Sequence, residues 1–244
     1  MKITIRKKDN EVKTISQWPM PKKNNQWKEG RSAWAMANYV LNLSSNFEDM
    51  IEKILADCQI QMQHFKCEPE ATAGLGKGFG RGGSRNHDML MIGKDCVIGI
   101  EAKVSEPFDR EIGKVICEGG TRKDRALSLI DYLAGKHEND NQLKKIGYQL
   151  FTAARGTICS AEKEKKHNAI FLVIVFTGCV DKEKDYIERC RKNDADFNSF
   201  LKFVNADENG VIKDNKNIES INCWIKKVEI EVKKANGNYI FKYK

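Results

Sequence analysis

Two runs of strand-forming residues joined by a tight turn constrain the fold of this chain more than any other feature. Residues 89–92 and 96–104 have the composition of strands, and the segment 93–95 between them is typical of a hairpin connection. In the second run the apolar residues alternate with Gly99, Glu101 and Lys103. Because the side chains of a strand point alternately to its two faces, these charged side chains are expected to share one face.

Other periodic segments predict a mixed α/β chain. Apolar residues at helical spacing predict helices at 31–41, 46–58, 122–133, 142–165 and 182–204, with Ser32 and Asn46 as N-caps of the first two. Strands are predicted at 2–6, 169–176, 223–232 and 239–243, the last two joined by a turn at 235–238. The apolar run 169–176 is far shorter than the ~20 residues that span a bilayer. It therefore predicts a buried strand and no membrane segment.

The order of these segments divides the chain into three parts. We predict an N-terminal arm at residues 1–30, a main domain at 31–177, and a C-terminal helix and β-hairpin extension packed on it at 178–244. Hydrophobic residues make up 41% and charged residues 31%, which is typical of a globular protein. No apolar stretch follows the basic N-terminus, and the eight cysteines lack metal-ligand spacing. We expect a cytoplasmic protein with reduced cysteines.

The charge of the chain is basic and unevenly distributed. Its formal net charge is +8, and the stretch from Glu70 to Asp88 has no acid between its ends but three cations, Lys77, Arg81 and Arg85. Such a distribution is compatible with a polyanionic partner, although many basic proteins have none.

Residues 73–88 hold six glycines, between positions 74 and 83, which predicts a loop without regular structure. Residues 78–83 match the G-x-G-x-x-G dinucleotide pattern, but that pattern should follow a strand and open a helix, whereas a strand comes next here. We predict instead a flexible loop whose amides and cations contact phosphates. A disordered loop with incidental charge is the open alternative.

The predicted hairpin brings two carboxylates to the same end. Asp88 stands at the mouth of its first strand and Glu101 near the far end of its second. Mg²⁺ usually takes only one or two protein carboxylates, and it assists phosphodiester hydrolysis by activating water and neutralising charge. Lys103 projects beside Glu101, where its ammonium can position the attacking water or stabilise developing charge. The alternative is an edge strand with a solvated face, on which Glu and Lys at this spacing are common.

Residues 84–104, SRNHDMLMIGKDCVIGIEAKV, resemble the core motif of the PD-(D/E)XK nuclease superfamily. Asp88 matches the leading acid and Glu101-Ala102-Lys103 the E-x-K, while His87 stands in place of the usual Pro. The resemblance implies an α/β, restriction-endonuclease-like αβββαβ core with a mixed central sheet flanked by helices over 31–177, its first strand near 65–71. More narrowly, GRSAWAMA and the continuation after E-x-K resemble an uncharacterised bacterial family of this fold.

The resemblance also implies a site. Its metal ligands would be Asp88, Glu101 and Ala102, joined by an acid of the first core helix. Glu48, at the edge of the apolar stripe of residues 46–58, and Glu52, just beyond it, are the two candidates. Gln149 would be presented by the second helix as a polar contact to nucleic acid. Mg²⁺ is the expected cofactor, with Mn²⁺ as a substitute.

These expectations define a Mg²⁺-dependent deoxyribonuclease that acts on DNA, with a defence role against foreign DNA suggested by the resemblance alone. Double-strand cleavage would favour a homodimer with one site per strand. Two alternatives from other classes stay open. One is a catalytically silent subunit that keeps the nuclease fold and binds nucleic acid or assembles with other chains. The other is a basic surface that serves a protein partner.

Overall fold

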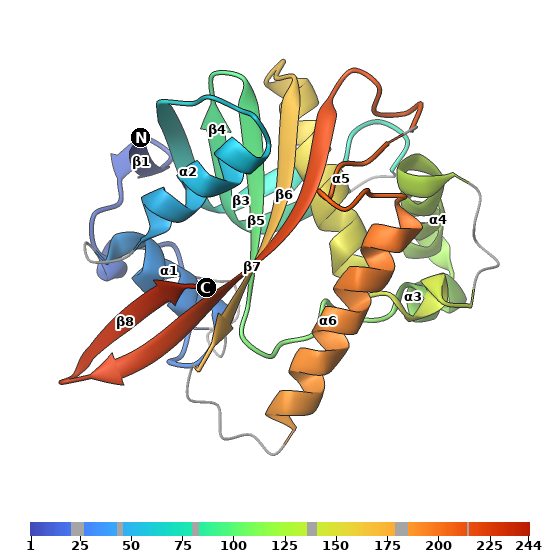
Figure 1. Cartoon of the computed structure of the whole chain (residues 1–244). Coiled ribbons are helices and arrows are strands. Elements are labelled where there is room, and N and C mark those ends of the chain that lie inside the picture. Colours follow the sequence, from blue (N-terminus) through green and yellow to red (C-terminus); the bar gives the residue numbers. More distant parts are fainter. Residues whose placement is uncertain (21–26, 43–45, 80–82, 136–140, 179–184, 214) are drawn as a thin grey trace.

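One mixed β-sheet runs through the protein. The structure is a computed structural model that describes residues 1–20, 27–42, 46–79, 83–135, 141–178, 185–213 and 215–244. Within these residues the eight strands follow the order β2-β1-β3-β4-β5-β6-β7-β8 (Figure 1). They are β1 Lys2–Lys7, β2 Asn10–Glu11, β3 His64–Gly74, β4 Ser84–Gly93, β5 Cys96–Lys103, β6 Asn168–Thr177, β7 Asn222–Ala235 and β8 Asn238–Tyr243.

The sheet is mixed, with both parallel and antiparallel pairs of strands. The parallel pairs are β1 with β3, β5 with β6, and β6 with β7. The remaining neighbours pair antiparallel, including the predicted β4–β5 hairpin, whose two strands are separated by only Lys94 and Asp95. The predicted strands are confirmed, and the final turn is closed by Asn236 and Gly237, both with positive φ as a two-residue hairpin turn requires.

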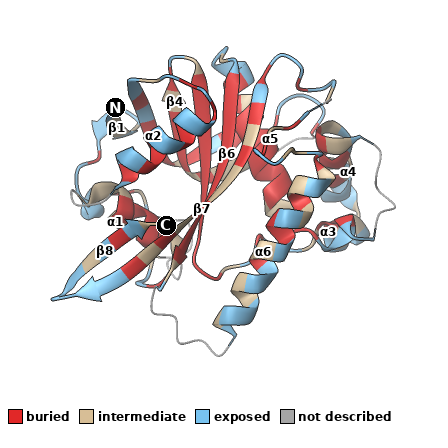
Figure 2. Cartoon of the chain, in the orientation of Figure 1, coloured by how far each residue is buried: buried red, intermediate tan, exposed pale blue. Residues whose placement is uncertain are grey.

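Helices cover both faces of the sheet, which confirms the α/β class. They are α1 Ser32–Leu41, α2 Phe47–Asp57, α3 Ile112–Cys117, α4 Gly120–Ala134, α5 Tyr148–Lys163 and α6 Tyr186–Phe203, with short 3-10 turns η1 Ile15–Gln17 and η3 Leu143–Lys145. One buried cluster lies under α1 and α2, and a second joins the opposite face to α3, α4, α5 and α6. Figure 2 shows the central strands buried along nearly their whole length.

The order of elements matches the expected one. A helical pair precedes the strands β3, β4 and β5; α3, α4 and η3 come between β5 and α5, and β6 follows α5. The elements α6, β7 and β8 form the C-terminal α+β part. The sheet passes through all three predicted segments of the chain, because β1 and β8 belong to it. Among the described residues, no helix has the length and apolarity needed to cross a membrane.

Three local predictions were wrong. The helix expected at 142–165 is interrupted before Tyr148, because Gly147 is extended and packs against the backbone of Phe108 too closely for a side chain. Ser32 is the first residue of α1 rather than its N-cap, a position held by Arg31. The segment after residue 73 is not all loop: β3 runs to Gly74 and β4 begins at Ser84, since these ends pair with each other.

The β3–β4 ladder has one interruption. Pro69 pairs with Met89 and Ala71 with His87, but the ladder omits Glu70 and Asp88, which lie between these pairs. Glu70 has φ of 48°, in the left-handed region that side chains disfavour. At this point β3 changes the face on which its buried residues pack: Phe65 and Cys67 join the α1–α2 cluster, whereas Ala71 joins the opposite one. The interruption therefore re-aims the side chains around it.

Candidate functional site

A charged pocket opens where β4 and β5 separate. Its volume is about 910 Å³, and its walls come from the start of α1, from β3, β4 and β5, and from α4 and α5. Among the residues that the structure describes, ten charged side chains line it, five of each sign: the cations Lys28, Arg31, Arg85, Lys103 and Arg125, and the acids Glu70, Asp88, Glu101, Glu106 and Asp109. The sequence predicted four of these as site residues, namely Arg85, Asp88, Glu101 and Lys103.

The two strands of the hairpin part at Asp88. Their ladder ends at the pair Met89 and Ile100, although both strands continue. Beyond it the backbone N–H of Ala102 donates to Asp88 Oδ2 over 2.7 Å, so a side chain replaces the backbone partner. The N–H and C=O of one strand residue point to the same side, which directs the Ala102 carbonyl toward this gap as well. A carboxylate and a carbonyl oxygen thus share the opening.

Glu101 is a buried charge with several partners. The residue is 2% exposed, and its side chain points to the α5 face of the sheet. Arg85 Nη2 donates to Oε2, while Gln149 Nε2 donates to Oε1 and Lys103 Nζ lies 3.1 Å from Oε1. Burial favours the neutral acid, but the charges of Arg85 and Lys103 outweigh it and lower the pKa of Glu101. Glu101 is therefore ionised at neutral pH.

Lys103 is fixed beside Glu101, as the strand alternation predicted. It is 5% exposed, and its Nζ donates to Gln149 Oε1 over 2.7 Å and lies 5.3 Å from the ring centre of Phe108. Gln149, on the first turn of α5, thus binds both charged residues through the two ends of its amide. The structure places this predicted residue inside the pocket, where it orients the other two.

Two further carboxyls face Glu101. Burial, followed by the charges of Glu101 and Glu70, raises the pKa of Asp88 well above its ordinary value. Burial and then the charge of Glu101 raise the pKa of Glu70 to about 7. A cation placed among these groups would relieve their mutual repulsion. Glu70 was missed by sequence reasoning, because its role depends on its unusual backbone and not on a motif.

The donor set fits a hard divalent cation. Asp88 and Glu101 supply two carboxylates and Ala102 a carbonyl, which agrees with the few protein oxygens that Mg²⁺ usually takes. Among the described residues, no group of three or more His, Cys, Asp or Glu side chains is arranged to hold a metal. Direct ligation would therefore rest on this pair and the carbonyl, with water completing the coordination.

The structure does not bring Glu48 or Glu52 to this pocket. Their helix α2 packs its apolar stripe on the face that carries Ile98 and Ile100, while Glu101 points to the other face. Glu48 is exposed, and Glu52 accepts a hydrogen bond from the amino group of Met1.

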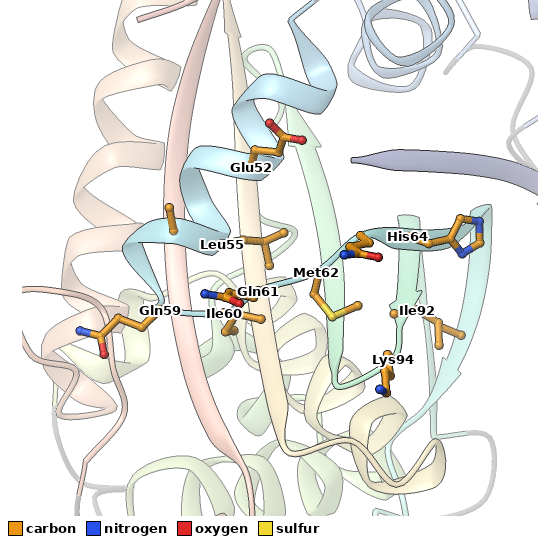
Figure 3. Close-up of a pocket in the computed structure, with 12 residues that line it drawn as sticks. Glu52, Leu55, Gln59, Ile60, Gln61, Met62, His64, Ile92 and Lys94 are labelled. Carbon is orange, nitrogen blue, oxygen red and sulfur yellow. The ribbon is translucent and has the colours of Figure 1, made fainter.

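Glu52 instead belongs to a second pocket at the turn end of the hairpin. Figure 3 shows Glu52 on α2 above a hollow that Lys94 borders from the turn. Its volume is about 1040 Å³, and glutamine, methionine and aliphatic side chains form most of its lining. Its polar residues Gln61, His64 and Lys94 are exposed. It holds no buried charge among the side chains that line it, and we assign it no chemistry.

The described part of the glycine-rich segment is held in place rather than free. Arg125 Nε donates to the carbonyl of Phe79 over 3.1 Å, and the Arg155 guanidinium lies 5.2 Å from the Phe79 ring centre. Gly76 has φ of 89°, which side chains disfavour, and a Cβ there would lie 2.6 Å from Arg155 Nη2. Lys77 is exposed at the surface, and the predicted contact Arg81 lies outside the described residues.

Glu106 is another site residue that sequence reasoning did not single out. Its carboxylate accepts hydrogen bonds from the backbone N–H of Ser32 and of Val104, each over 2.9 Å. It thereby ties the start of α1 to the end of β5. Burial alone would raise its pKa, but these backbone hydrogen bonds lower it below the ordinary value. A carboxylate following the E-x-K is the only signal that pointed to it.

Comparison with known proteins gives a family but no activity. The family model for a domain of unknown function, DUF6946, matches residues 11–232. No curated protein and no solved structure matches the chain.

Proposed function

The chain belongs to the DUF6946 family, and we propose that it is a Mg²⁺-dependent deoxyribonuclease of the PD-(D/E)XK type. The observation that carries the proposal is the parted end of the β4–β5 hairpin. There Asp88 and Ala102 meet beside the buried pair Glu101 and Lys103. This is the arrangement that the motif resemblance led us to expect.

The burial of these charges supports a catalytic role. A buried ion pair contributes little to stability, because the loss of hydration offsets the attraction between the charges. Glu101 and Lys103 are 2% and 5% exposed, on a strand whose other residues are apolar apart from Gly99 and could have packed without them. Buried charged pairs of this kind are typical of functional sites.

Each residue has a role in this proposal. Bound at Asp88, Glu101 and the Ala102 carbonyl, Mg²⁺ would supply charge neutralisation and activation of water. Lys103 holds its ammonium beside this position, where it orients the attacking water and stabilises negative charge on the phosphate. Gln149 keeps Glu101 and Lys103 in register through its amide. Arg85 neutralises Glu101 from the other side.

The pocket carries cations that suit a polyanion. Lys28, Arg31 and Arg125 line it together with the acids of the site, and the exposed Lys77 lies on the glycine-rich segment that Arg125 anchors. With a formal net charge of +8, the chain favours association with nucleic acid. We propose DNA as the substrate, and a homodimer as the form that cuts both strands.

Cleavage assays test the proposal. Supercoiled DNA, linear DNA and RNA of equal length are incubated with the protein in Mg²⁺, Mn²⁺ or EDTA. We expect nicked or linear DNA products with either metal and none in EDTA. The variant Asp88→Asn should give no products, and its circular dichroism spectrum should match that of the wild type. Sedimentation of the protein bound to DNA gives its oligomeric state. Comparing that state with the cleavage products shows whether double-strand cleavage accompanies dimer formation.

Other outcomes point elsewhere. Salt-dependent DNA binding without cleavage in any metal would replace the enzyme by a nucleic-acid-binding subunit that retains the fold. Cleavage of RNA but not of DNA would show that the proposed substrate is wrong. Cleavage by Asp88→Asn at the wild-type rate would show that the proposed site is wrong.

A further inference from the structure

Lys7, the last residue of β1, reaches across to an irregular point of β3. Its Nζ donates to the carbonyls of Pro69 over 2.9 Å and of Glu70 over 2.8 Å. A third hydrogen bond, 3.1 Å long, joins it to Glu68 Oε1. The Lys7 side chain is 31% exposed, so most of it is packed against β3. One ammonium thus binds three consecutive residues of the neighbouring strand.

The backbone at Glu70 needs such support. A residue with a side chain rarely adopts φ of 48°, and it keeps that conformation only where its surroundings hold it. Lys7 donates hydrogen bonds to the Pro69 carbonyl, which precedes the Glu70 nitrogen, and to the Glu70 carbonyl, which follows its Cα. These two hydrogen bonds stabilise the backbone conformation of Glu70. The ladder between β3 and β4 is interrupted at this same position.

The consequence is the placement of the Glu70 carboxylate. It lines the pocket with Asp88 and Glu101, and the three groups are close enough to influence one another's charge. They do not form a three-carboxylate ligand cluster in the described part of the chain. Water between Glu70 and the cation is the contact that this arrangement allows, since Mg²⁺ keeps several waters.

We infer that Glu70 is a further carboxylate of the metal site, acting through water, and that Lys7 is the residue that positions it. The inference rests on the proposed function, because it assumes a cation at Asp88 and Glu101. It also makes β1, which lies outside the predicted nuclease core, a working part of the site.

Calorimetric titration with Mn²⁺ in the absence of DNA tests the inference. We expect Glu70→Gln to weaken Mn²⁺ binding about 10-fold, as loss of an outer-shell partner does. Lys7→Met should weaken it in the same direction. If Lys7 acts through Glu70, the double variant binds Mn²⁺ no more weakly than Glu70→Gln alone. A merely structural role of Lys7 would instead add a further loss.

Matched controls separate position from charge. Glu68→Gln removes the carboxylate that Lys7 contacts directly, and Lys2→Met removes an exposed cation from the same strand. Both should bind Mn²⁺ as the wild type does. Circular dichroism and thermal unfolding in EDTA verify that each variant folds. If Glu70→Gln does not fold, Glu70→Asp takes its place in the titration.

The outcomes distinguish the inference from the function on which it rests. Loss of Mn²⁺ binding in Asp88→Asn, with unchanged affinity in Glu70→Gln, overturns the inference and leaves the proposed site intact. Unchanged Mn²⁺ binding in Asp88→Asn overturns both. A loss in Glu68→Gln as large as that in Glu70→Gln would show that charge near Lys7, and not Glu70, is responsible.

Discussion

The two ends of the β4–β5 hairpin differ in the burial of the polar side chains beside them. At the turn end the ladder is complete to the pair Ile92 and Val97. The polar residues that line the adjacent pocket (Figure 3) are exposed. At the open end the ladder stops early, and Glu101 and Lys103 are almost fully buried. The pocket at the turn end is the larger, about 1040 Å³ against about 910 Å³.

The volume of a pocket is therefore a poor guide to its chemistry. An exposed glutamine or lysine keeps its hydration, so its position costs the fold little. A buried charge loses its hydration and must be held by partners. The open end contains the groups that are costly to place, and it is there that we expect activity. Four experiments test this contrast between the two ends.

The largest expected effect is on cleavage. Glu101→Gln and Lys103→Met each remove a group that would contact the cation or the phosphate, so each should lower the DNA cleavage rate about 100-fold or more. Glu52→Gln and Lys94→Met at the turn end should leave the rate unchanged. Rates are compared at saturating Mg²⁺. An equal loss at the turn end would erase the contrast between the two pockets.

The next effect is on stability. Arg85→Met leaves Glu101 with fewer positive partners in a buried place, which should lower the free energy of unfolding by about 3 kcal/mol. Lys94→Met, at an exposed position, should change it by less than about 0.5 kcal/mol. Urea unfolding at pH 7 in EDTA measures both. Similar values for the two variants would show that burial does not set the cost.

A smaller effect depends on pH. In the folded protein the pKa of Glu70 is raised from 4.5 to about 7. As pH rises, Glu70 therefore loses its proton at lower pH in the unfolded chain than in the folded protein. Without metal, the wild type should therefore lose stability relative to Glu70→Gln between about pH 4.5 and 7, on the order of 1–2 kcal/mol after solvent screening. Urea unfolding of both proteins at several pH values tests this. Added Mn²⁺ should reduce the difference in stability between the wild type and Glu70→Gln. A gap that is constant with pH would contradict it.

The smallest effect is on the salt dependence of DNA binding. Lys77→Ala and Arg81→Ala each remove a predicted phosphate contact, so each should reduce the slope of log affinity against log salt by about 0.9. Lys94→Ala at the turn end should leave the slope unchanged. Binding is measured in Ca²⁺ or EDTA to prevent cleavage. An unchanged slope in all three variants would remove the glycine-rich segment from the interface.

The sequence predicted those features that depend on local periodicity. Strand alternation placed Glu101 and Lys103 on one face, and the turn composition fixed the hairpin that brings Asp88 to them. It could not decide which face of the sheet α2 covers, so Glu48 and Glu52 were considered for a site that their helix does not reach. That choice depends on long-range packing.

Features that depend on single backbone angles were also beyond sequence reasoning. The position of Glu70 follows from a positive φ and an interrupted ladder, which no composition rule assigns to a glutamate. The break before α5 depends on the close approach of Gly147 to Phe108. The proposed chemistry itself stays a prediction.

The pairing of β5 has a consequence for the newly made chain. β5 is buried along its whole length, and its partner β6 begins at Asn168, after three intervening helices. During synthesis the hairpin therefore presents an unpaired apolar edge until those residues have emerged, and such edges can pair with other chains. Gln149, which holds Glu101 and Lys103, arrives in the same interval. The charged pair is completed only when the edge is about to be covered.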